Sequence, residues 1–180
     1  MMHRSPLAAA LALAALLCAR PAVAHLPVAA TAPAFTAQAA QGGAISTFDL
    51  REALARGPVV LYFFPQAFTS GCTAEAHDFA EHIAAYKALG ATVVGISGDS
   101  IATQAKFSTQ ECRSKFLVAA DPGLKIAHAY DAVILGLYAD RTSYVIAPGG
   151  TIAYTYTDLD PDQHVARTLA ALRALRRAAP

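Results

Sequence analysis

The most informative stretch of this chain is residues 65–72, Pro65-Gln66-Ala67-Phe68-Thr69-Ser70-Gly71-Cys72, which is expected to connect a strand to a helix. The apolar run at residues 59–64, Val-Val-Leu-Tyr-Phe-Phe, precedes the loop and is typical of a buried strand. A helix-forming segment follows it, so Cys72 is expected in the first turn of a helix. There, unpaired backbone N–H groups and the positive end of the helix dipole favour an anion. The sequence therefore predicts a reactive thiolate at Cys72, with the Thr69 hydroxyl placed over the same sulfur.

The segments on either side of this loop predict an alternation of strands and helices. We expect a hairpin turning at Gly42-Gly43 and, in the second half, an antiparallel hairpin turning at residues 148–151. The expected helices cover residues 47–56, 71–89, 100–110 (with Ile101 and Ala105 on one face) and a last segment starting at Asp160; the further strands cover residues 91–97, 116–119, 143–147 and 152–156. This order predicts an α/β fold with a mixed central sheet and helices on both faces.

The first 24 residues have the pattern of a secretory signal peptide. Arg4 lies in a positively charged start, residues 7–18 are Leu, Ala and Cys only, and Ala22-Val23-Ala24 supplies the small residues of a cleavage site. A membrane anchor is the alternative, but the apolar run is short for a bilayer. We expect cleavage after Ala24. The mature chain, residues 25–180, would then be a single exported domain, periplasmic and without stable membrane association.

Charge and cysteine content narrow the function classes. The 180 residues carry 14 Lys and Arg against 13 Asp and Glu, so the chain lacks the excess of positive charge that is typical of proteins that bind nucleic acid. Of the three cysteines, Cys18 would leave with the signal peptide, and Cys72 and Cys112 would remain. Outside the cytosol, two cysteines usually form a disulfide, so Cys112 is a candidate partner for Cys72.

The pattern Pro-x-x-x-Thr-x-x-Cys between a strand and a helix resembles the active-site signature of the peroxiredoxins. Further blocks are similar in the same order, and the resemblance extends over roughly residues 33–172. These blocks are Pro33-Ala34-Phe35, Cys72-Thr73-Ala74-Glu75-Ala76, Gly95-Ile96-Ser97-Gly98-Asp99-Ser100 and Asp140-Arg141-Thr142-Ser143-Tyr144-Val145-Ile146. The subgroup that it resembles most is the bacterioferritin-comigratory, or peroxiredoxin Q, type. The resemblance implies a thioredoxin-like fold of three α/β/α layers.

The resemblance also implies the roles of four residues in a thiol-dependent peroxidase. Cys72 would attack hydrogen peroxide or an organic hydroperoxide and become a sulfenic acid. Arg141 would be the permanent cation beside the sulfur, Thr69 would orient the peroxide, and Pro65 would shield the pocket from water. Taken singly, each of these residues also has an ordinary structural explanation: a strand end, a loop hydroxyl, a surface arginine or a buried cysteine. Glu75 is either a first-turn acid or the partner of an arginine.

How the sulfenic acid would be resolved is left open between two routes. Many members of the subgroup carry a second cysteine five residues after the first, but position 77 is His77 here. A resolving cysteine at Cys112 resembles another arrangement of the subgroup and would give an intramolecular disulfide, re-reduced by a thioredoxin-like protein. The alternative is a one-cysteine enzyme that uses an external thiol. No cofactor and no metal is expected, since His77 and His82 are not spaced to share a helix face, and the subgroup implies a monomer.

Two rival functions share the expected fold. A thiol–disulfide oxidoreductase would place Cys-x-x-Cys at the helix start, and only one cysteine is present there. A non-peroxidase thiol sensor or binding module would use the same scaffold, because function resides in the site rather than in the fold.

Overall fold

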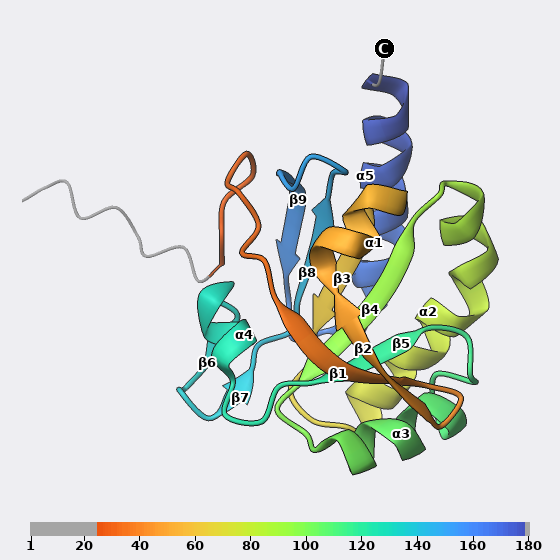
Figure 1. Ribbon diagram of the computed structural model, residues 1–180, viewed down its shortest axis with the longest axis vertical. Helices are drawn as coiled ribbons and strands as arrows, with labels where there is room; N and C mark the ends of the chain where they lie inside the picture. The colour runs from red at the N-terminus through yellow and green to blue at the C-terminus, as the bar shows by residue number, and fades with distance from the viewer. Residues whose placement is uncertain (1–24, 179–180) are drawn as a thin grey trace, which may run out of the picture.

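A computed structural model describes residues 25–178 of this chain. The expected signal peptide, residues 1–24, lies outside the described residues. The elements follow in the order β1 (Thr36–Gln41), β2 (Ala44–Asp49), α1 (Leu50–Arg56), β3 (Val59–Phe63), α2 (Ser70–Ala88), β4 (Thr92–Ser97), α3 (Ile101–Gln110), β5 (Leu117–Ala120), α4 (Lys125–Ala129), β6 (Val133–Ile134), β7 (Tyr138–Ala139), β8 (Thr142–Ile146), β9 (Ile152–Thr157), the 3₁₀ helix η2 (Pro161–Gln163) and α5 (His164–Ala178). Strands and helices alternate through the first half, as the sequence predicts (Figure 1).

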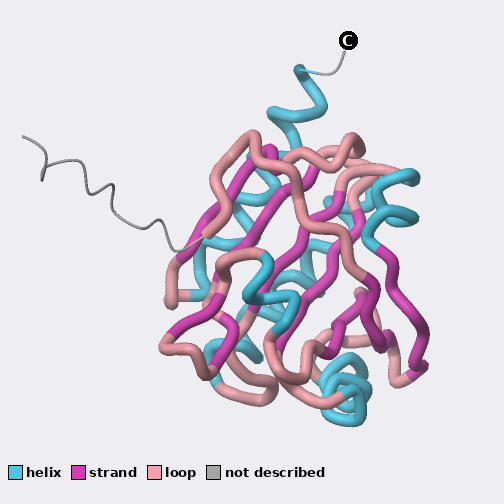
Figure 2. Tube along the Cα trace, turned by 60° about the vertical axis from the view of Figure 1, so that its left-hand side comes forward, coloured by secondary structure: helices cyan, strands magenta, loops and turns pink. Residues whose placement is uncertain are grey.

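Seven strands form one mixed sheet in the order β2-β1-β5-β4-β3-β8-β9. Figure 2 draws the strands in magenta and the helices in cyan. The pairs β3/β4 and β4/β5 are parallel, whereas β1/β2, β1/β5, β3/β8 and β8/β9 are antiparallel. Strand β3 therefore lies inside the sheet, and the loop that leads to Cys72 in α2 leaves its carboxyl end. The expected α/β fold with a mixed central sheet is confirmed.

Strand β3 is apolar at every position, as expected for a strand whose sheet is covered by helices on both faces. Val59, Leu61 and Phe63 belong to the core cluster that α1 and α4 cover. The alternate residues, Val60 and Tyr62, belong to the cluster that α2, α3 and α5 cover. Successive side chains of a strand point to opposite faces, so one continuous apolar strand supplies both cores. Cys72 and Cys112 both lie in the second cluster, on the same side of the sheet.

One local prediction was wrong. The first helix begins at Leu50 rather than near Thr47: its N-cap is Asp49, whose carboxylate accepts a hydrogen bond from Glu52 N at 3.1 Å. Residues 44–49 instead pair with β1. In α3 the fully buried residues are Gln104, Phe107 and Ser108, while Ile101 and Ala105, four residues apart, are partly buried.

The segment between α4 and β8 also differs from the prediction, which contained no strands there. Two-residue strands β6 and β7 form a small hairpin that lies together with α4 at one side of the molecule (Figure 1). Strands this short carry no readable periodicity. Among the described helices, none combines the length and the apolar composition that crossing a bilayer requires.

Candidate active site

Cys72 lies in the first turn of α2, with its side chain buried. The helix begins after Thr69, which has an extended backbone and whose hydroxyl forms no cap, so this side chain binds no N–H group of the first turn. The hydroxyl of Thr69 instead donates a hydrogen bond to the carbonyl oxygen of Gln66 at 3.0 Å. The helix start is therefore an open anion site with one sulfur in it.

Arg141 brings the positive charge to that sulfur. It immediately precedes β8, which pairs with β3. Its Nη2 donates a hydrogen bond to Cys72 Sγ at 3.4 Å, and its Nε donates to the carbonyl oxygen of Leu159 at 2.9 Å. A buried guanidinium held at several of its donors is fixed in orientation as well as in charge. The sequence analysis places Arg141 beside Cys72, although the two are 69 residues apart, and in the structure their side chains are in direct contact.

Gly71 leaves the space that this contact needs. A side chain built at Gly71 would have its Cβ at 3.1 Å from Arg141 Nη2, which is tighter than an ordinary van der Waals contact. The short residue before Cys72 therefore lets the guanidinium reach the sulfur.

Glu75 completes the contacts of Arg141. It lies one helical turn after Cys72, on the same face of α2, and is fully buried. Its Oε2 accepts a hydrogen bond from Arg141 Nη1. Of the two explanations open for Glu75 from the sequence, the partner of an arginine is the one found. Burial raises the pKa of the Glu75 carboxyl to about 8, in spite of the neighbouring guanidinium.

The loop between β3 and α2 is held by Asp99, which the sequence did not mark as a site residue. Asp99 Oδ2 accepts hydrogen bonds from Ala67 N at 2.8 Å and from Ser97 Oγ at 2.6 Å. Gln104 of α3 in turn donates to Ser97 Oγ at 2.7 Å. Phe68 adopts a positive φ of 65°, an uncommon conformation for a bulky residue, and packs edge-on against Phe107. These contacts come from distant parts of the chain, so no local sequence signal identifies them.

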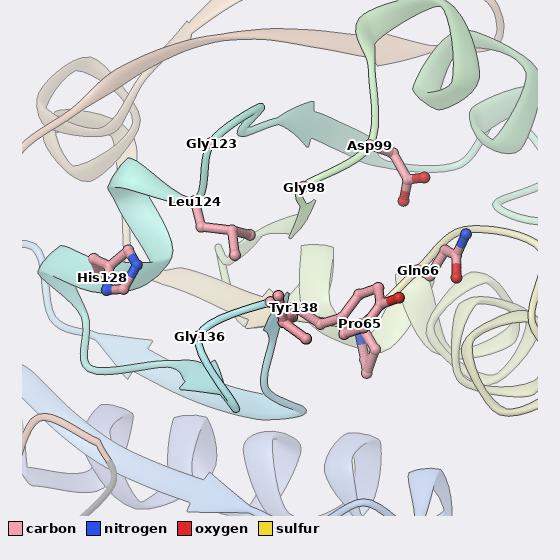
Figure 3. Close-up of a pocket in the computed structure, with 10 residues that line it drawn as sticks. Pro65, Gln66, Gly98, Asp99, Gly123, Leu124, His128, Gly136 and Tyr138 are labelled. Atoms are coloured by element: carbon pink, nitrogen blue, oxygen red, sulfur yellow. The ribbon is translucent and has the colours of Figure 1, made fainter.

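A pocket of about 370 Å³ lies beside the loop, at the carboxyl edge of the parallel strands (Figure 3). Its walls come from the loops after β3, β4 and β5, from α4 and from the β6–β7 hairpin. They are Pro65, Gln66, Gly98, Asp99, Gly123, Leu124, His128, Gly136, Leu137 and Tyr138. Pro65 thus borders a pocket as expected, but Cys72 and Arg141 are not among the lining residues.

Cys112 follows the end of α3 and is completely buried as a free thiol. Burial raises the pKa of the Cys112 thiol well above its usual range. The next two residues, Arg113 and Ser114, both have positive φ values, of 49° and 59°. Two side-chain contacts hold this turn on α2: a hydrogen bond between His77 Nε2 and Glu111 Oε2 at 2.7 Å and an ion pair between Arg113 Nη1 and Glu81 Oε1 at 3.2 Å.

The fold is α/β, and the site has one cysteine at a helix start whose sulfur is bonded to a buried arginine. These features define the class of thiol proteins that use a single cysteine as the nucleophile. Comparison with known proteins agrees. The sequence profile of the AhpC/TSA family matches residues 28–155. Peroxiredoxin Q of rice (Oryza sativa subsp. japonica) is 33% identical over 147 residues, which cover 80% of this chain and 65% of the rice protein. The chain thus spans slightly less than two thirds of that relative.

Solved structures give the same answer. The peroxidoxin BcpB of Mycobacterium tuberculosis is 30% identical, with a TM-score of 0.75 over 84% of this chain and 99% of that one. The reduced 2-Cys peroxiredoxin of Plasmodium vivax, 21% identical with a TM-score of 0.76 over 83% of this chain and 82% of that one, shares the fold. The chain therefore belongs to the AhpC/TSA family and, within it, to the peroxiredoxins of the Q, or bacterioferritin-comigratory, subgroup. Its thioredoxin-like fold is confirmed.

Proposed function

We propose that this protein is a thiol-dependent peroxidase that reduces hydrogen peroxide or organic hydroperoxides through a sulfenic acid at Cys72. The observation that carries the proposal is the contact between Arg141 Nη2 and Cys72 Sγ at 3.4 Å, in the first turn of α2. The guanidinium and the free first-turn N–H groups both favour the thiolate, which is the form that attacks peroxide. Membership of the peroxiredoxin family supports the same activity.

The chemical step uses only the thiolate and the peroxide. The sulfur of Cys72 attacks one peroxide oxygen, so an S–O bond forms while the O–O bond breaks. The other oxygen leaves as hydroxide or alkoxide and takes up a proton to become water or an alcohol. Cys72 is oxidised to the sulfenic acid and the peroxide is reduced. Arg141 stabilises the negative charge as it moves from sulfur to the leaving oxygen.

Thr69 and Pro65 have supporting roles in this proposal. Because the Thr69 hydroxyl donates its hydrogen to Gln66 O, its oxygen is left as an acceptor for the O–H of a bound peroxide. Pro65 ends the strand without a backbone N–H and borders the pocket at the strand edge. The first would orient the peroxide and the second would limit the access of water.

A test of the activity is peroxide consumption by the reduced full chain in the presence of a small dithiol. The proposal predicts many turnovers per protein, and none with Cys72→Ser. A wild-type rate no faster than that of the dithiol alone would contradict it, and would favour the rival thiol sensor or binding module. That rival is not favoured here, because a binding module has no need of a buried cation on its cysteine.

Cys112 is proposed as the resolving cysteine, through an intramolecular disulfide with Cys72. Its thiol is buried and protonated where it stands, so the turn after α3 has to open before the two sulfurs meet. The left-handed conformations of Arg113 and Ser114 cost energy that opening would release. The side-chain contacts of Glu111 and Arg113 with α2 oppose that opening.

The pair between His77 and Glu111 gives a prediction about the rate of this opening. Removing it in His77→Ala should speed disulfide formation up to about fivefold, since partly exposed pairs contribute about 0.2–1 kcal/mol. Quenched-flow mass spectrometry after one equivalent of peroxide measures that rate. His82→Ala is the matched control, because His82 pairs with Asp78 within α2 and should leave the rate unchanged. Disulfide formation at the wild-type rate in His77→Ala would contradict the prediction.

We also propose that a thioredoxin-like or other thiol protein reduces the disulfide, and that the mature protein is a periplasmic monomer comprising residues 25–180. The signal-peptide pattern of residues 1–24 supports export. The intact mass of the protein from a periplasmic extract tests this: a chain beginning at His25 supports the proposal, and one beginning at Met1 contradicts it.

A further inference from the structure

Only one of the two carboxyl oxygens of Glu75, the buried acid that contacts Arg141, has a hydrogen-bond partner in the part of the chain that the structure describes. Glu75 Oε2 is paired with Arg141 Nη1, but Glu75 Oε1 has no hydrogen-bond partner among the described residues, although the side chain is fully buried. A buried carboxylate with one bare oxygen is costly in its charged form and much less so when it carries a proton.

The nearest group to the bare oxygen is a neutral histidine. His164 Nδ1 lies 3.7 Å from Glu75 Oε1. Its other nitrogen, Nε2, is 3.0 Å from the carbonyl oxygen of Asp158, which can only accept, so Nε2 carries the ring proton. Nδ1 then accepts from the Ser143 hydroxyl at 2.8 Å and presents no hydrogen to Glu75. Burial lowers the pKa of His164 to about 4, so the ring remains uncharged at neutral pH.

The other ionisable groups around Glu75 do not supply a second positive charge. From α2 it is influenced by Asp78, an acid that also raises the pKa of Glu75. From β3 Tyr62 approaches, and burial raises the pKa of its hydroxyl, so that Tyr62 is neutral as well. Arg141 is therefore the cation that serves both Cys72 and Glu75. With both groups ionised, the buried cluster would carry a net negative charge, which is costly away from water.

We propose that Glu75 holds a proton while Cys72 is a thiolate and releases it when Cys72 is oxidised, so that Arg141 balances first the sulfur and then the carboxylate. This inference rests on the proposed peroxidase function. Because Glu75 contacts Arg141 rather than the peroxide, it is a positioning residue. Burial raises the pKa of Glu75 to about 8, so the proton is held at pH 7 and lost as the pH rises above that value.

The proton balance follows from this exchange. Oxidation of a thiolate by hydrogen peroxide forms the sulfenic acid and hydroxide, and the hydroxide takes one proton from the solvent to become water. In the same event the sulfur becomes neutral, so the charge of Arg141 balances that of the Glu75 carboxylate it already contacts, and the Glu75 carboxyl releases one proton to the solvent. A later disulfide with the protonated Cys112 thiol releases water and no proton. The whole oxidation at pH 7 therefore consumes no net proton.

Proton uptake during oxidation tests the inference. A pH indicator in weakly buffered solution at pH 7, with one equivalent of hydrogen peroxide, should show almost no uptake in wild type and about one proton per Cys72 oxidised in Glu75→Gln. Glu52→Gln, which removes an exposed acid of α1, should match wild type. Uptake of about one proton in wild type, or no uptake in Glu75→Gln, would overturn the proposal.

A second measurement does not depend on the folding of the glutamine variant. Infrared difference spectra of wild type, reduced minus oxidised, should contain the carbonyl band of a protonated carboxyl group in the reduced state, and its absence would overturn the proposal. Mass spectrometry of the same samples separates the two claims. If Cys72 is not oxidised in wild type, the peroxidase function fails. If Cys72 is oxidised while the proton count or the band is wrong, only the role of Glu75 fails.

Discussion

Replacing Arg141 with alanine is expected to slow the oxidation of Cys72 by hydrogen peroxide by about 10²-fold or more. Loss of one preorganised charged donor at a reacting centre has effects of this size in other enzymes. Here Arg141 Nη2 contacts the sulfur directly, at 3.4 Å in a buried site, and a water molecule in its place would bring no positive charge. Stopped-flow measurement of the second-order rate constant, with Cys72 oxidation confirmed by mass spectrometry, gives the comparison.

The fold should survive Arg141→Ala because the acid left behind can be neutral. Glu75 retains a proton near neutral pH, which avoids an unpaired buried charge. Arg141→Lys keeps the charge but cannot donate at once to Cys72, Glu75 and the Leu159 carbonyl, so its rate should fall between those of wild type and the alanine variant. Arg173→Ala, at an exposed position of α5, is the control. An alanine variant that is folded and as fast as wild type would contradict the role of Arg141.

Replacing Cys112 with serine is expected to separate oxidation from turnover. Because Cys112 is not needed for attack on the peroxide, Cys72 should be oxidised at nearly the wild-type rate. The intramolecular disulfide cannot form, so turnover with a thioredoxin-like reductant should fall to near the background rate. Cys72 should then accumulate as sulfenic acid and, with excess peroxide, as sulfinic acid. Mass spectrometry under non-reducing conditions distinguishes these products.

The interpretation of Cys112→Ser depends on the burial of this residue. A hydroxyl without a partner there costs about 1–3 kcal/mol, so the variant is to be compared with Cys112→Ala, which buries no polar group. Both variants should lose turnover alike. If both turn over as fast as wild type, Cys112 is a bystander and the protein is a one-cysteine peroxidase that uses an external thiol.

The sequence predicted those parts of the molecule whose causes are local. An apolar strand followed by a loop and a helix located Cys72, and Ser100 as a cap predicted α3, whose first residue is Ile101. The start of α1 was misplaced because two residues near it, Thr47 and Asp49, are both able to cap a helix, and pairing with β1 decides between them.

The parts that the sequence did not predict depend on contacts between distant residues. Gln104 is polar and yet buried, because it donates to Ser97 of β4 and to the Ala119 carbonyl of β5. The role of Asp99 in holding the active-site loop depends on a hydrogen bond from Ala67, 32 residues away. The proximity of Glu75 in α2 to His164 in α5 is also a long-range contact. Nothing in the sequence around Glu75 or around His164 predicts it. Arg141 could be named beforehand only through the resemblance to a family.

The central claim is that Cys72 is the thiol that peroxide oxidises. The most direct test treats the reduced protein with one equivalent of hydrogen peroxide and maps both cysteines by mass spectrometry without reductant. We expect a disulfide between Cys72 and Cys112 within one chain. If the turn after α3 does not open, we expect Cys72 as sulfenic or sulfinic acid instead. Two unreacted thiols, or oxidation of Cys112 while Cys72 remains free, would contradict it.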